Sequence, residues 1–157
     1  MRQDGHHPIA SSAGLLAVAT WSVYVLFGGI FYFPDVPPSA LTIGFFGLLA
    51  CLAVILNFAR WRLIVILASV VYLSFYATRV VRMLAMTTEF DLSSLPSALS
   101  FYYGASWRVT AGMLEERGVI AGWTHGFLEY AMPVLSLALI GLALISRRSR
   151  SGVSQGG

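Results

Sequence analysis

The sequence predicts an all-α integral membrane protein, a four-transmembrane-helix bundle with two short amphipathic interfacial helices between spans three and four. Of its 157 residues, 57% are hydrophobic and only 11% are charged, which leaves too little polar surface for a soluble domain of this length. Four apolar stretches are long enough to cross a hydrocarbon layer of about 30 Å, which takes about 20 residues. One polar segment separates the last two stretches.

We expect one transmembrane domain over 1–146, followed by a basic, disordered tail over 147–157. The first apolar stretch is too long for a signal peptide and has no cleavage site after it, so it is interpreted as a retained span. The four spans are predicted over 9–33, 40–59, 63–84 and 124–146.

The arginines predict the orientation of the spans, because basic residues gather in short cytoplasmic loops. Six of the ten arginines lie on one side if both termini are cytoplasmic: Arg2, Arg60, Arg62, Arg147, Arg148 and Arg150. The loop after the first span, "FPDVPPS", holds an aspartate and no basic residue. We therefore expect a protein integral to the bacterial cytoplasmic (inner) membrane, with both termini in the cytoplasm.

The polar segment 87–123 is expected on the outer side and predicts two short helices, over 94–103 and 106–117. Serine is a preferred N-cap residue, so Ser94 and Ser106 are candidates to begin the two helices. Glycine commonly follows the last turn of a helix, so Gly104 and Gly118 are candidates to end them. Amphipathic helices of this kind lie at a membrane surface.

The second of these helices presents a candidate docking surface. Trp107 lies near one face of it, whereas Arg108, Glu115 and Glu116 point elsewhere. Two readings stay open, namely a lid that covers the bundle and a docking surface for another protein.

Arg79 and Glu129 are predicted to form an ion pair. Arg79 lies 17 residues beyond Arg62, about 25 Å along a helix. Glu129 lies 18 residues before Arg147, about 27 Å along the antiparallel span. The two charges therefore reach the same depth near the outer edge of the hydrocarbon. An unpaired charge there costs roughly 2.5 kcal/mol or more, and Glu129 is too short to reach the headgroups.

Arg82 and His125 lie one turn further out than this pair, and Tyr76 lies one turn further in on the third span. Together these residues make a candidate outward-facing ligand site. Pro133 removes the helical partner of the Glu129 carbonyl, which favours a kink or a pocket. The cluster is interpreted as a structural lock between two spans, as a site for an anion, lipid or proton, or as an acid–base centre.

Several function classes lack support in the sequence. A net charge of +3 is too small to indicate nucleic-acid binding. One cysteine and three scattered histidines do not supply a zinc site, and no nucleophile motif or phosphate loop is present. We therefore expect no metal, no cofactor and no catalytic residue.

The leading functional hypothesis is a non-catalytic accessory or assembly subunit of a larger membrane complex. It would lie in the lipid bilayer with other subunits or as a homo-oligomer. The alternative is transport or binding of a small anion or lipid at the Arg79 cluster. A membrane enzyme of unknown reaction is the third.

Overall fold

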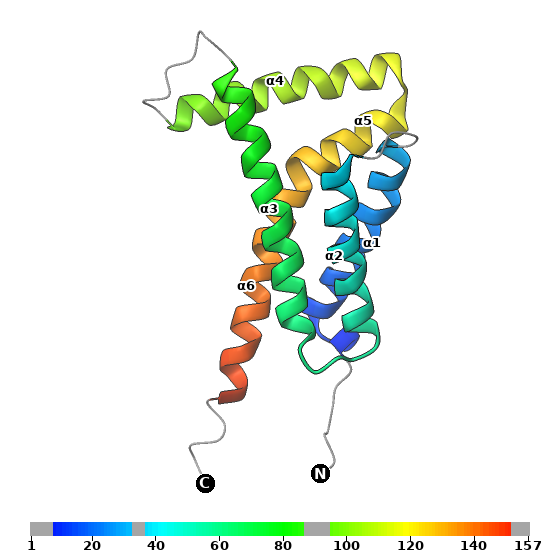
Figure 1. Ribbon diagram of the computed structural model, residues 1–157, viewed down its shortest axis with the longest axis vertical. Helices are drawn as coiled ribbons and strands as arrows, with labels where there is room; N and C mark the ends of the chain where they lie inside the picture. The colour runs from blue at the N-terminus through cyan, green and yellow to red at the C-terminus, as the bar shows by residue number, and fades with distance from the viewer. Residues whose placement is uncertain (1–7, 33–36, 87–94, 152–157) are drawn as a thin grey trace.

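The computed structural model describes residues 8–32, 37–86 and 95–151, which fold into helices joined by short turns (Figure 1). The all-α fold class is thereby confirmed. The elements are a 3₁₀ turn η1 (Pro8–Ala10), α1 (Ser12–Tyr32), α2 (Pro38–Ile55), α3 (Trp61–Ala85), α4 (Leu95–Glu116), α5 (Val119–Gly126), a π-helical turn η2 (Phe127–Ala131) and α6 (Met132–Ser151).

Three helical stretches are long and apolar enough to cross a membrane, which marks the chain as a membrane protein. They are Pro38–Ile55, Trp61–Ala85 and Val119–Ile145, the last of which joins α5, η2 and α6 without a break. The apolar part of α1 with described side chains, Ser12–Gly28, is shorter. A fourth span over α1 stays a prediction.

Four helices pack in a ring, in which α1 contacts α2, α2 contacts α3, α3 contacts α6, and α6 contacts α1. The start of α1, the turn between α2 and α3 and the end of α6 lie at one end of this bundle (Figure 1). At the other end α4 lies across the bundle, and α5 leads back from it into α6.

Small residues bring α1 and α2 close together. The indole of Trp21 on α1 is fully buried and lies against Gly47 on α2. A Cβ atom at Gly47 would come within 2.6 Å of Trp21 Cε3, well inside van der Waals contact. Glycine at this position therefore permits the close contact that apolar helices need to associate in a membrane.

The second helix ends earlier than the predicted residue 59, because the chain turns at Asn57. Asn57 has a φ of 51°, and its N–H donates to Val54 O at 3.2 Å. The N–H of Phe58 donates to Ala53 O at 2.8 Å. These two bonds form a Schellman motif with asparagine in the left-handed position, which ends α2 at Ile55.

The two short helices predicted over 94–103 and 106–117 are one continuous helix, α4, so this prediction is wrong. Gly104 does not end the helix. The buried side chains of α4 recur every four residues on both sides of Gly104, and they are Ala98, Tyr102, Ser106 and Thr110. Only an unbroken helix keeps this stripe on one face, and its packing outweighs the cost of a glycine, about 1 kcal/mol. Ser94 lies outside the described residues.

The predicted boundaries of the last span also shift. Gly118, with a φ of 87°, makes the turn after α4, and the next helix begins at Val119 rather than at 124. At the other end α6 continues to Ser151 and includes 147–151, which the sequence assigns to a disordered tail. Three arginines in this stretch are good helix formers, which lets the helix propagate. Residues 152–157 lie outside the described part of the chain.

Candidate functional site

A buried carboxylate lies where α3, α4, α5 and η2 meet. The side chain of Glu129 is 3% exposed, and its Oε1 forms an ion pair with Nη2 of Arg79, whose side chain is 47% exposed. The structure therefore brings together the two charges that helix geometry places at one depth. The Glu129 side chain is therefore buried, whereas the Arg79 side chain is about half exposed.

Tyr102 on α4 completes the binding of this carboxylate. Its hydroxyl donates to Glu129 Oε2 at 2.7 Å and accepts from Arg79 Nη2 at 3.3 Å. Burial, together with the hydrogen bond to Glu129, raises the pKa of Tyr102 to about 12, so the phenol stays a donor. Sequence reasoning missed Tyr102, because nothing in the sequence says where α4 crosses α3.

His125 connects the same carboxylate to α4. Its Nε2 lies 3.9 Å from Glu129 Oε1, and its Nδ1 lies 2.8 Å from Thr110 Oγ1. The Thr110 hydroxyl also donates to Ser106 O at 3.0 Å. Thr110 carries no motif that could have identified it; only the four-residue spacing of buried positions on α4 indicates that it points inward.

The backbone at Glu129 is unusual, because η2 is a π-helical turn. The N–H of Met132 donates to Phe127 O, five residues earlier. In this register Pro133 would pair with the carbonyl of Leu128, but proline has no N–H to donate. The turn thus leaves carbonyl groups that need other partners, and such π-turns occur often at functional sites.

Two tyrosines of α3 supply those partners. The hydroxyl of Tyr72 donates to Leu128 O at 2.5 Å, and that of Tyr76 donates to Glu129 O at 3.3 Å. The guanidinium of Arg79 lies 5.5 Å from the centre of the Tyr76 ring, which is cation–π distance. The predicted site residue Tyr76 therefore belongs to the cluster.

Six of the seven tyrosines lie in one continuous row. Successive ring centres are between 5.5 and 6.1 Å apart. The row runs through Tyr24, Tyr72, Tyr76, Tyr102, Tyr103 and Tyr130. Through these ring contacts the row connects α1 and α3 to α4 and η2.

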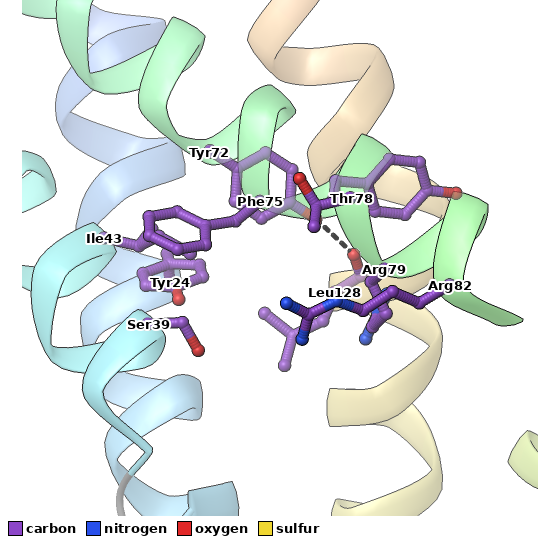
Figure 2. Close-up of a pocket in the computed structure, with 10 residues that line it drawn as sticks. Tyr24, Ser39, Ile43, Tyr72, Phe75, Thr78, Arg79, Arg82 and Leu128 are labelled. Atoms are coloured by element: carbon purple, nitrogen blue, oxygen red, sulfur yellow. Dashed lines mark hydrogen bonds between the residues drawn. The ribbon is translucent and has the colours of Figure 1, made fainter.

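A cavity of about 380 Å³ lies beside the ion pair, between α1, α2, α3 and η2, and we call it the arginine cavity. Its charged and hydroxyl-bearing lining residues other than tyrosine are Ser39, Thr78, Arg79 and Arg82. Figure 2 shows Arg82 extended from α3 across the cavity, with Ser39 on the opposite side. Within the described residues Arg82 forms no ion pair, so its positive charge is not neutralised there.

The predicted docking residues lie on α4 outside the arginine cavity, and the ring centre of one of them, Trp107, lies 6.5 Å from that of Tyr130. Trp107 is 63% exposed and lines a separate apolar cavity of about 410 Å³ between α4 and α5, the α4–α5 cavity. Glu115 and Glu116 are exposed, and Nε of Arg108 donates only to the Gly104 carbonyl, at 3.4 Å. These four residues do not form a site with Arg79.

The arginine cavity presents two guanidinium groups beside hydroxyls and aromatic rings. In residues 8–32, 37–86 and 95–151 no group of histidine, cysteine, aspartate and glutamate side chains is placed to hold a metal ion. The chain matches no family model, no curated protein and no solved structure. Function is therefore inferred from two guanidinium groups beside hydroxyls and aromatic rings.

Proposed function

We propose that this protein binds an anionic group in the arginine cavity. The observation that carries the proposal is the Arg82 guanidinium, which lines the cavity and has no ion-pair partner in the described part of the chain. Planar guanidinium groups bind phosphate and carboxylate oxygens through paired hydrogen bonds. The Ser39 hydroxyl lines the same cavity and adds a donor for an oxyanion, whereas the Thr78 hydroxyl donates to Ser74 O at 2.8 Å.

The buried carboxylate does not cancel this attraction. Oε1 of Glu129 pairs with Arg79 and balances its charge, and the Tyr102 hydroxyl donates a hydrogen bond to Oε2 of Glu129. Among the described residues, Arg82 then leaves the cavity lining with a net positive charge. Arg79 is held by Glu129 on one side, while its half-exposed guanidinium also lines the cavity.

The setting of this proposal is a four-span bundle with both termini cytoplasmic and the arginine cavity at the outer face of the bacterial inner membrane. With 21 residues, α1 is about 32 Å long, enough to cross the hydrocarbon. Arg60 and Arg62 lie in or next to the α2–α3 turn, at the same end as the start of α1 and the end of α6 (Figure 1). Basic residues favour the cytoplasmic side. In this setting α4 lies across the outer surface as an interfacial helix.

The test is a binding measurement on the full chain in a neutral detergent. Glycerol 3-phosphate and phosphatidylglycerol present the same kind of anionic group in soluble and lipid form. We expect at least one of them to bind, with Arg82→Gln weakening the affinity about tenfold, which corresponds to about 1.4 kcal/mol. Arg117→Gln removes the same charge from the exposed α4–α5 turn and should leave the affinity unchanged. Equal affinities for wild type and Arg82→Gln would refute the proposal.

A second candidate, an accessory or assembly subunit, is favoured by exposed apolar side chains on α4. Trp107 is 63% exposed and Val109 48%, although α4 is not one of the candidate spans. A partner subunit would cover them. Native sizing after mild extraction should then give a species heavier than the 17.1 kDa chain. Trp107→Ser should release the partner, and a lone chain in every detergent would argue against this function.

A further inference from the structure

We infer that the ligand of the arginine cavity is an anionic lipid, with its phosphate at Arg82 and its first acyl carbons in the apolar part of the cavity. This inference rests on the proposed anion binding and names the class of ligand. Its support is the way polar and apolar groups are ordered along the cavity.

Along two of the helices that border the cavity, α2 and α3, polar lining residues lie nearer the α4 end and apolar ones lie deeper. On α3, Phe75 lies seven residues before Arg82, about 10 Å deeper along the helix. On the antiparallel α2, Ser39 lies in the first turn and Ile43 one turn deeper. All four residues line the cavity. Polar groups therefore gather at the α4 end, and apolar groups lie toward the middle of the bundle.

The inner wall of the deeper part is apolar and buried. Ile43 is 6% exposed, and the rings of Tyr24 and Tyr72 also line the cavity there (Figure 2). Leu128, which is 5% exposed, precedes Glu129 and lies at the level of the ion pair. Ligand sites combine such apolar walls with a few polar groups that fix orientation. A small inorganic anion would contact only the polar end, whereas a lipid would cover both ends.

The cavity is also open toward the side of the bundle. Phe75 on the apolar helix α3 is 39% exposed, and Thr78 and Arg82 are exposed as well. For a membrane-spanning helix, this exposed side faces lipid. A ligand can therefore enter sideways from the bilayer, and the rest of its chains can stay there. The volume of about 380 Å³ suits a headgroup with the first part of its chains.

The test compares three probes on the full chain in a neutral detergent: phosphatidylglycerol, phosphatidylcholine and glycerol 3-phosphate. We expect phosphatidylglycerol to bind about tenfold more tightly than either of the other two, because only it presents both an uncompensated anion and acyl chains. Native mass spectrometry and the shift in thermal unfolding temperature report the affinities.

Variants separate the apolar contribution from the charge. Phe75→Ala should weaken phosphatidylglycerol binding about fivefold and leave glycerol 3-phosphate binding unchanged. Phe45→Ala is the matched control, because Phe45 is 60% exposed on α2 and does not line the cavity. Phe75→Leu keeps an apolar side chain and should retain most of the lipid affinity, even if Phe75→Ala lowers stability.

The outcomes distinguish the two proposals. If glycerol 3-phosphate binds as tightly as the lipid and both depend on Arg82, anion binding stands and the lipid inference is overturned. If phosphatidylcholine equals phosphatidylglycerol, or if no probe depends on Arg82, anion recognition fails and the lipid inference fails with it.

Discussion

Removing both partners of the Arg79–Glu129 pair should destabilise the protein by less than the sum of the two single removals. With Arg79→Leu the Glu129 carboxylate stays buried, and among the described residues Tyr102 is the one hydrogen-bond donor left at close range. Breaking a buried ion pair costs about 3–5 kcal/mol, and half-exposed Arg79 lowers the figure here to about 2 kcal/mol.

With Glu129→Leu the positive partner is left over instead. Arg79 can turn toward the surroundings, because its side chain is 47% exposed. The buried Tyr102 hydroxyl loses its acceptor, which costs about 1–3 kcal/mol. In the double variant Arg79→Leu with Glu129→Leu only the Tyr102 cost remains, so its loss should be close to that of Glu129→Leu and smaller than the sum of the two single losses.

The assay is the free energy of unfolding in mixed detergent micelles for wild type, the two single variants and the double variant. We expect a coupling energy of about 1–2 kcal/mol in this double-mutant cycle. Arg108→Leu is the control, because Arg108 is exposed on α4, and its effect should stay within about 0.5 kcal/mol. Additive losses in the cycle would refute the pairing.

Three further predictions concern packing, the α2–α3 turn and pH. Gly47→Ala should lower the free energy of unfolding by about 1–3 kcal/mol, because its Cβ meets Trp21; Gly44→Ala, with nothing within 4 Å, should not. Asn57→Val should cost about 1–3 kcal/mol, since φ is 51° there, whereas Asn57→Gly should keep stability. The pKa of Tyr102 is raised to about 12, so the contribution of this phenol to the free energy of unfolding is complete below its ordinary pKa of about 10 and is lost as pH rises from about 10 through about 12. Tyr102→Phe should therefore flatten the alkaline decline of stability measured by denaturant titration. An unchanged decline would contradict this prediction.

Three apolar helices long enough to cross a membrane and one ion pair could be predicted, because they depend on local quantities. Apolar length identifies the helices that cross the bilayer, and the fixed rise of a helix places Arg79 and Glu129 at one depth. Pro133 could be predicted to free a carbonyl, because its missing N–H is a local property. At that depth the predicted spans hold few other charged residues with which Arg79 or Glu129 could pair.

The rest of the cluster depends on how α4 lies across the bundle. Tyr102 and Thr110 reach Glu129 and His125 only through that crossing, which neither composition nor spacing specifies. The same crossing explains why Gly104 does not end a helix: its weak helix propensity is outweighed by packing that the sequence does not reveal. The end of α2 at Ile55 likewise depends on one asparagine in a left-handed conformation.

Photolabelling with a phosphatidylglycerol that carries a diazirine next to its phosphate tests the central claim most directly, because it reports where the anion lies. We expect the label on peptides that contain Ser39, Thr78 or Arg82, with labelling reduced in Arg82→Gln. The α4–α5 cavity, lined by Trp107 and Trp123, is the natural alternative site for an apolar ligand. Labelling concentrated on those two tryptophans, unchanged in Arg82→Gln, would contradict anion binding in the arginine cavity.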